Sequence, residues 1–325
     1  MEIVHNNAIQ VSVVIPLYNK GRTICRTLDS ILNQSFKKWE CVVIDDGSTD
    51  AGPSIVRSIT DTRIRLYSQK NSGPGAARNH GVKLSRAGLL AFLDADDEWH
   101  PDYLLHHIEQ LARYPEATAS ICGHTRVGTH TDTERLFRQS GIEDGLWQMP
   151  QDYLPEQIKI ATDFMHSGSV MIRKETFLKY GGYFDRFRST YGEDTHLWLQ
   201  VVASERLYRS PKPLMSYHVE DSVLGLGRKS SPPPWPMLYN PDVLLAACRP
   251  ETRQTLRSGL SFYALLACNR LLIQGRCGEA LKVLRVNDGY RILSSPRAMA
   301  ERKKMRLLLL KQPYYLLKRA ILLGR

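Results

Sequence analysis

Three carboxylates stand close together in the segment FLDADDEW, where Asp94, Asp96 and Asp97 follow a short apolar run. Like charges this close repel one another strongly unless a cation compensates them. Mg²⁺ and Mn²⁺ take carboxylate oxygens as ligands and keep coordination positions for phosphate oxygens. We therefore expect Asp94 and Asp96 to hold Mn²⁺ or Mg²⁺. The alternative is a solvated acidic loop that caps the next helix.

A second acidic pair, Glu193 and Asp194 in YGEDTHLW, opens a predicted helix over residues 193–202. Acidic side chains at a helix N-terminus interact favourably with the helix dipole, so the pair alone requires no catalytic role. His218 in MSYHVEDS is equally open to two interpretations, because a lone histidine is either a packing residue or a metal ligand.

Two further segments suit a nucleotide. In VVIDDGSTD, Asp45 and Asp46 either end a strand before a turn, or one of them accepts hydrogen bonds from a base or ribose. In NSGPGAARNHG, Gly73 and Gly75 resemble a dinucleotide-binding loop, but Arg78 replaces the third glycine and the loop does not follow the first strand. An arginine in the first turns of a helix favours a phosphate ligand over a nicotinamide cofactor.

The elements that carry these residues alternate between strands and helices. Apolar runs predict strands at 11–17, 41–44, 63–68, 89–93 and 169–172, with helices at 23–34, 74–85 and 193–202. This alternation is typical of an α/β fold whose parallel strands end at one edge of the sheet, where such folds bind ligands. Residues 119–147 have a weaker pattern and predict short strands and loops.

A boundary between two regions is expected near residue 225. The segment 225–236, GLGRKSSPPPWP, is dense in Gly, Ser and Pro, as linkers are. We assign 1–225 to a catalytic domain and 226–325 to a basic, mainly helical region with helices at 241–248, 254–272 and 279–286. The tail 299–325 mixes Lys and Arg with Leu, and Pro313 should divide it into two helical pieces.

Charge and composition limit the possible functions. The chain of 325 residues has a net charge of +11, but residues 226–325 hold 19 Lys and Arg against 5 Asp and Glu. Such a region should seek polyanions. The 6 cysteines show no paired spacing, which argues against a zinc cluster and favours a reducing, cytoplasmic compartment. The N-terminus lacks a secretory pattern, and no apolar run reaches the roughly 18 residues needed to span a bilayer.

Six motifs, VSVVIPLYNKG, RTLDSILNQSF, VVIDDGSTD, NSGPGAARNHG, LDADDEW and YGEDTHLW, occur together in an order that resembles family 2 glycosyltransferases over residues 10–225. The resemblance implies a GT-A fold, a nucleotide-diphosphate sugar as donor, a divalent metal, and inversion at the anomeric carbon. It implies a hexosyl- or N-acetylhexosaminyltransferase, with UDP as the expected nucleotide. The QxxRW motif of processive members is absent, so we expect transfer of a single sugar.

The resemblance also assigns roles to single residues. It implies that Asp194 is the catalytic base and that Glu193 is its neighbour in the catalytic pair. Asp94 and Asp96 match the DXD motif and, with His218, the metal site, and Asp97 is a possible substitute for Asp96. The donor-binding set is Pro16, Tyr18, Asn19, Asp46, Arg78, Asp94, Ala95 and Asp96.

The expected partners follow from the same motifs and from the charge. The acceptor is expected to be a glycan or lipid-linked hydroxyl in bacterial surface polysaccharide synthesis. The basic C-terminal region predicts peripheral contact with the anionic inner face of the cytoplasmic membrane; the alternative is a helical appendage whose cations are simply solvated or support a dimer or other homo-oligomer. We expect no nucleic-acid binding, because few aromatic side chains accompany the cations. The alternative function is a non-catalytic, sugar-nucleotide-binding scaffold of a polysaccharide assembly complex.

Overall fold

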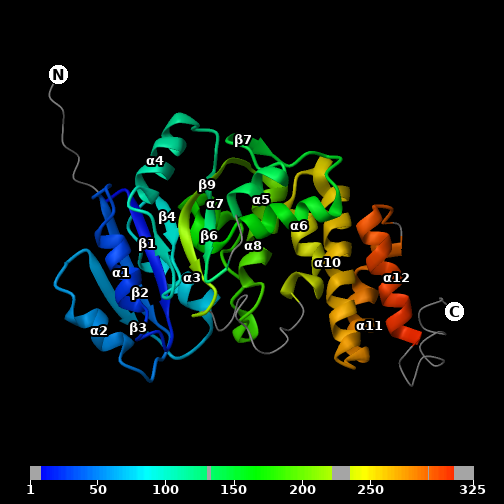
Figure 1. Ribbon diagram of the computed structural model, residues 1–325, viewed down its shortest axis with the longest axis horizontal. Helices are drawn as coiled ribbons and strands as arrows, with labels where there is room; N and C mark the ends of the chain where they lie inside the picture. Colours follow the sequence, from blue (N-terminus) through cyan, green and yellow to red (C-terminus); the bar gives the residue numbers. More distant parts are fainter. Residues whose placement is uncertain (1–8, 130–132, 222–234, 292, 311–325) are drawn as a thin grey trace. The chain divides into compact units, whose positions relative to one another are not determined.

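The computed structural model describes residues 9–129, 133–221, 235–291 and 293–310 (Figure 1). The described chain forms two compact units. The first holds the residues up to 148 and those from 162 to 221, and the second holds 149–161 and the residues from 235 onward. The segment 149–161, which the sequence analysis places in the N-terminal region, thus belongs with the C-terminal helices.

A mixed sheet of nine strands forms the centre of the first unit, counted over the described residues. Four neighbouring strands run parallel, and the remaining strands continue the sheet from β4 in mixed directions. The predicted α/β class is confirmed. The sheet order is β3 (Ile64–Ser68), β2 (Trp39–Asp45), β1 (Val11–Leu17), β4 (Leu89–Phe92), β8 (Val170–Arg173), β6 (Ala119–Val127), β9 (Arg206–His218) and β5 (Glu98–Trp99), and β7 (Gly145–Gln148) pairs with β9.

Helices cover both faces of the parallel strands, which explains why those strands read as continuous apolar runs. Alternate β1 residues from Val11 to Leu17 share one buried cluster with α1 (Ile24–Leu32) and α4 (Tyr103–Arg113). On the opposite face, Val42 and Ile44 pack against Ala77 of α3 (Pro74–Leu84). A Cβ on Gly81 would lie 2.3 Å from Val14, so only glycine permits this approach of α3 to β1.

Parallel pairing brings the chemically interesting segments to one edge of the sheet. Leu17 at the end of β1 pairs with Asp45 at the end of β2, and β4 ends just before the acidic loop, defined here as residues 94–97. The helix α8 (Glu193–Ser204) begins with the second acidic pair, and β9 ends at His218. The smaller helices α2 (Gly52–Ser58), α5 (Thr133–Gln139) and α7 (Lys174–Lys179) complete this unit.

The strand β9 is the main element that the sequence analysis did not predict. Its sequence RLYRSPKPLMSYH contains two prolines, which normally argue against a strand inside a sheet. The pairing of β6 with β9 is accordingly irregular around Gly123, where a Cβ would lie 2.3 Å from the carbonyl oxygen of Pro211. Irregular pairing accommodates the prolines, so β9 still carries His218 to the edge of the acidic loop.

The second unit is helical. Its helices are α9 (Pro241–Ala247), α10 (Arg253–Ile273), α11 (Cys277–Val286) and α12 (Pro296–Leu310), together with the first part of α6 (Pro155–Phe164). The buried helix α10 packs against both α11 and α12, and Asn269 Nδ2 of α10 donates a 2.8 Å hydrogen bond to Glu301 of α12. None of the helices in the described ranges has the length and apolar character of a membrane span. The predicted break at Pro313 lies outside the described residues.

Candidate active site

Each carboxylate of the acidic loop has a different partner. Asp94 Oδ1 accepts a 2.5 Å hydrogen bond from Arg78 Nη2, and Asp96 Oδ2 accepts one of 2.5 Å from Lys20 Nζ. Asp97 Oδ1 accepts a hydrogen bond of 3.0 Å from the backbone N–H of His218. The other carboxylate oxygen of Asp97 is buried and has no hydrogen-bond partner among the described residues. The loop therefore has one carboxylate oxygen, Asp97 Oδ2, that could accept a bond from a ligand.

The three carboxylates also raise one another's cost of ionisation. Burial raises the pKa of Asp97 well above its usual range, and the charges of Asp96 and Asp94 add to the effect. Burial and Asp94 likewise raise the pKa of Asp96 against the opposing charge of Lys20. Burial would raise the pKa of Asp94 too, but the nearby Arg78 guanidinium lowers it. Asp96 and Asp97 are therefore costly to ionise unless a further cation compensates their charge.

A group of three possible metal ligands includes a histidine that the sequence analysis missed. Ligand atoms of Asp94, Asp97 and His166 all lie within 4.8 Å of one another. Two carboxylates and an imidazole are donors that Mn²⁺ accepts, and the unpartnered oxygen of Asp97 is a buried acceptor that such an ion would satisfy. The residues present therefore fit a divalent cation.

The predicted ligands Asp96 and His218 lie beside this group but have other partners. Asp96 is bound by Lys20, whereas the Nε2 atom of His218 lies 2.7 Å from Glu98 Oε1. His218 belongs instead to a second cluster with Glu220 and Asp221. Of the two candidates that the sequence left open, Asp97 is the one that shares the three-ligand group with Asp94.

Arg78 connects the acidic loop to α8. Its guanidinium is buried, lies 2.5 Å from Asp94 Oδ1, and donates a 3.1 Å hydrogen bond to Glu193 Oε1. The sequence predicts that Arg78 reaches toward the nucleotide, and the structure shows it between two carboxylates. Burial and the charge of Asp194 raise the pKa of Glu193 to about 7, although Arg78 opposes this shift.

Asp194 is less buried than Glu193, its neighbour in the chain that Arg78 binds. Burial lowers the pKa of His166, and the negative charges of Asp94, Asp194 and Asp96 all oppose that shift. Such an effect requires charges close to the imidazole. The two acidic motifs, far apart in the sequence, are joined through Arg78, which binds Asp94 of the first and Glu193 of the second.

Asp46, just beyond β2, holds a neighbouring loop through hydrogen bonds. Its carboxylate accepts hydrogen bonds of 2.8 Å from Gln69 Nε2 and from the backbone N–H groups of Ser72 and Gly73. Gly73 has a φ of 93°, which other residues rarely adopt, and it precedes α3. Asp46 thus positions the helix that carries Arg78. Its predicted contact with a base remains a prediction.

The remaining predicted donor-binding residues lie around the end of β1 or in the acidic loop. Pro16 is within β1, and Tyr18 just beyond it has 48% of its surface exposed. Asn19 has a left-handed backbone with φ 52°, and its side-chain oxygen accepts a 2.8 Å hydrogen bond from Thr49 N. Ala95 is buried in the core, and its carbonyl accepts a 2.7 Å hydrogen bond from Thr23.

Solved structures share the fold of this chain. Residues 1–349 of TarS from S. aureus, solved in complex with UDP-GlcNAc, give a TM-score of 0.67 at 15% identity, covering 97% of this chain and 92% of that one. The mannosyltransferase PcManGT from Pyrobaculum calidifontis, solved with GDP-Man and Mn²⁺, gives a TM-score of 0.56 at 21% identity, covering 97% and 86%. The predicted GT-A fold with C-terminal helices is confirmed.

Proteins with similar sequences are named as glycosyltransferases or for polysaccharide biosynthesis. The succinoglycan biosynthesis protein ExoO of Rhizobium meliloti is 44% identical over 150 residues, which are 46% of this chain and 42% of ExoO. Against the first matched curated relatives, three uncharacterized glycosyltransferases of Rickettsia species, the chain spans about a third of their length, at 33%, 34% and 29%. The family model "Glycosyl transferase family 2" matches residues 12–181. Because that match covers more than half of the chain, the protein belongs to glycosyl transferase family 2.

Proposed function

We propose that the protein is an inverting glycosyltransferase that moves one hexosyl or N-acetylhexosaminyl group from a nucleotide-diphosphate sugar to an acceptor hydroxyl. The observation that carries this proposal is that buried Arg78 joins Asp94 of the acidic loop to Glu193, the residue next to Asp194. It joins carboxylates suited to a cation and diphosphate with a carboxylate suited to accept a proton.

Asp194 is the general base in this proposal. It is partly exposed at the first turn of α8, whereas the adjacent Glu193 is buried against Arg78. A partly exposed carboxylate can approach an acceptor hydroxyl and take its proton as the oxygen attacks the anomeric carbon. One displacement with no covalent sugar–enzyme intermediate inverts that carbon. Glu193 and Arg78 hold the start of α8 in place.

Asp94, Asp97 and His166 would hold Mn²⁺ or Mg²⁺, with Asp96 beside them. When bound, such an ion stabilises the negative charge of the departing nucleoside diphosphate. The donor is expected to be UDP-linked, an assignment supported by the fold shared with TarS, which was solved with UDP-GlcNAc. Tyr18, exposed beyond β1, is available for contact with the base.

The acceptor is expected to be a glycan or a lipid-linked hydroxyl in bacterial surface polysaccharide synthesis. The sequence relative ExoO, named for succinoglycan biosynthesis, supports this setting. Such acceptors place the reaction in the cytoplasm or at the inner face of the cytoplasmic membrane.

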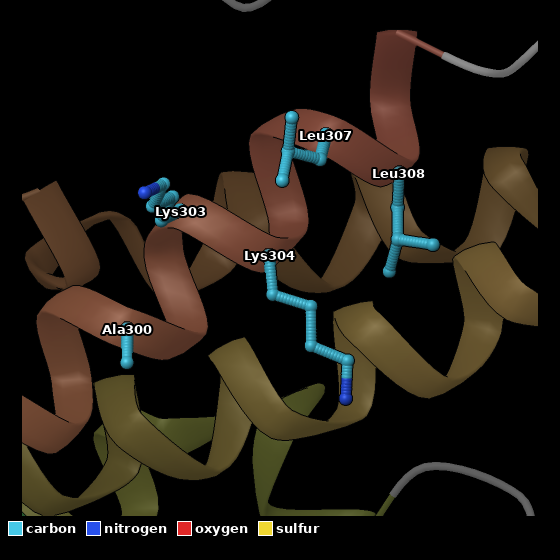
Figure 2. A pocket seen from close by; sticks show the side chains of 5 residues that line it. All are labelled: Ala300, Lys303, Lys304, Leu307 and Leu308. Carbon is cyan, nitrogen blue, oxygen red and sulfur yellow. The ribbon is translucent and has the colours of Figure 1, made fainter.

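The solvent side of α12 supports a peripheral contact with an anionic membrane. Five residues of α12 line a hollow of about 370 Å³, and Figure 2 shows their side chains: Ala300, Lys303, Lys304, Leu307 and Leu308. Leu307 is 51% exposed and Leu310 is 55% exposed. On a lipid surface, lysines such as these can meet phosphates while the exposed leucines beside them enter the headgroup layer.

The direct test of the proposed function is a donor screen. Purified protein would be incubated with UDP-, GDP- and dTDP-sugars and Mn²⁺, and release of the nucleoside diphosphate would be measured. One donor class should be hydrolysed, and Asp194→Asn should reduce that rate by about 10²-fold or more because the base is lost. Asp29→Asn, an exposed acid on α1, should keep the full rate. An equal rate in Asp194→Asn would refute the assignment of the base.

A further inference from the structure

Polar side chains of α1 and of its N-cap residue Thr23 donate hydrogen bonds to the backbone of the acidic loop. Thr23 Oγ1 donates to the carbonyl of Ala95 at 2.7 Å, and Thr27 Oγ1 donates to that of Asp97 at 2.8 Å. Arg26, between the two threonines, donates through Nη2 to the carbonyl of Asp96 at 2.5 Å. Three successive carbonyls of the loop are therefore held by one face of one helix.

Arg26 differs from the two threonines because it also binds the chain beyond β9. Its Nη2 atom donates a 2.8 Å hydrogen bond to Asp221 Oδ2, and its Nε atom lies 3.0 Å from Glu98 Oε1. Glu98 Oε1 in turn lies 2.7 Å from Nε2 of His218, whose backbone N–H donates to Asp97. One guanidinium thus joins three segments that the sequence separates widely.

Lys20 makes a parallel connection between the same two segments. Its ammonium donates to Asp96 Oδ2 at 2.5 Å and to the carbonyl of Asp221 at 2.7 Å. Lys20 meets the carboxylate of Asp96, whereas Arg26 meets its carbonyl oxygen. A change at either residue removes a cation, but Lys20 binds a carboxylate of the loop whereas Arg26 binds its backbone, so Arg26 is the more direct test of loop position.

We propose that Arg26 is a positioning residue for the cation and diphosphate site. It fixes the backbone of the acidic loop, and it holds Asp221 and the Glu98–His218 pair against that loop. Asp97 receives its hydrogen bond from His218 N, so the orientation of Asp97 depends on this connection. Residues that orient metal ligands from outside typically change metal affinity by about 10- to 100-fold when they are removed. This inference rests on the proposed function, since it assumes that the loop binds a cation.

The test is the affinity of the full chain for Mn²⁺, measured by calorimetry without donor. Arg26→Met should raise the Kd by about tenfold or more, because the loop loses its outer support. Arg26→Lys should give an intermediate Kd, since an ammonium can replace one of the contacts. The matched control is Arg63→Met, because the Arg63 side chain is 32% exposed and pairs with Asp61, while that of Arg26 is 33% exposed.

A second variant, Asp221→Asn, removes a partner of Arg26 while leaving Arg26 itself in place. It should raise the Kd several-fold, and combining it with Arg26→Met should add little, as expected for residues that act through one contact. If Arg26→Met does not fold, the Kd of Asp221→Asn alone tests the proposal. Melting temperatures of all variants would be recorded, and a purely structural role predicts that Tm falls while the Kd of the folded protein stays constant.

The outcomes separate this inference from the proposed function. If the unsubstituted protein binds Mn²⁺ and the Arg26→Met and Asp221→Asn proteins bind it equally well, the positioning role is refuted while the proposed function stands. An equal loss in Arg63→Met would also refute it. If the unsubstituted protein shows no saturable Mn²⁺ binding, the proposed cation site fails, and the role of Arg26 fails with it.

Discussion

Arg78 Nη1 lies 3.1 Å from Glu193 Oε1, although 115 residues separate the two in the chain. Through its other terminal nitrogen, Arg78 also binds Asp94. This buried guanidinium joins the first acidic motif to the second, and it explains how two short sequence patterns become one site.

The first prediction concerns the stability that Arg78 provides. Arg78→Met leaves the carboxylates of Asp94 and Glu193 without their shared cation. Removing one partner from a buried ion pair typically costs about 3–5 kcal/mol of the free energy of unfolding. We expect the free energy of unfolding to fall by about 3 kcal/mol, because the side chain of Asp94 is 27% exposed and partly screened. Urea denaturation measures it.

The control for this change is Arg138→Met, which breaks an exposed i,i+4 pair with Glu134. It should cost less than about 1 kcal/mol, as exposed pairs do. Equal stabilities for the Arg78→Met and unsubstituted proteins would show that Arg78 does not connect the two motifs in solution.

The second prediction distinguishes Asp97 from Asp96 as a cation ligand. Asp97 has a buried oxygen without a partner among the described residues, whereas Asp96 is bound by Lys20. Asp97→Asn should therefore raise the Kd for Mn²⁺ by about tenfold or more, and Asp96→Asn should raise it less. Calorimetric titration checks the order, and the reverse order would restore the DXD assignment made from the sequence.

The third prediction concerns the pH dependence of stability caused by Glu193. Burial and Asp194 raise its folded-state pKa to about 7 from an ordinary value of 4.5. The fold therefore favours the protonated form, so the stabilising contribution is complete below pH 4.5 and declines as the pH rises through about 7. The decline amounts to about 3 kcal/mol at most.

Glu193→Gln removes this titration while keeping the shape of the side chain. The difference in the free energy of unfolding between the two proteins should change across pH 4.5–7 and stay constant at higher pH. A difference that does not vary across this interval would contradict the raised pKa. Denaturation in a series of buffers at constant ionic strength provides the measurement.

The fourth prediction concerns α12 and lipid surfaces. The protein should co-sediment with vesicles that contain phosphatidylglycerol and much less with pure phosphatidylcholine. Replacing both Lys303 and Lys304 by Glu should lower the partition by about tenfold or more, since each basic residue near an anionic surface contributes about 1 kcal/mol. The effect should weaken as salt is added.

Its control makes the same change of charge in the first unit, at the exposed residues Lys37 and Lys83. That variant should sediment like the unsubstituted protein. Leu307→Ser should also weaken binding, because an exposed leucine contributes by entering the lipid. If all of these proteins bind equally, α12 is not the membrane contact.

Much of the parallel half of the fold could be predicted from the sequence. The runs at 11–17 and 89–93 are apolar on both faces because helices cover both sides of the sheet. Their ends were therefore visible as changes from apolar to polar residues, Tyr18 and Asn19 after the first run and Asp94 after the second. Residues 119–147 gave no such signal, since β6 and β7 depend on pairing with β9, whose prolines hide its pattern.

The candidate site was visible in part for the same reason. Asp94 and Asp194 lie in acidic motifs that suggest chemistry, whereas His166 lies in none of the six motifs and Arg26 opens the motif RTLDSILNQSF, which suggested no role for it. His166 joins the site because the chain before β8 passes the acidic loop, which depends on the antiparallel pairing of β8 with β4. A polar stripe at Thr23, Arg26 and Thr27 is visible in the sequence, yet only the structure shows that it faces carbonyl groups.

The most direct test of the account is the affinity of the protein for UDP, measured by calorimetry with Mn²⁺ and then with EDTA. If the acidic loop binds a cation that contacts the diphosphate, Mn²⁺ should tighten UDP binding by about tenfold or more, and Asp97→Asn should remove most of that gain. An affinity for UDP that is the same with Mn²⁺ and with EDTA would contradict the central claim.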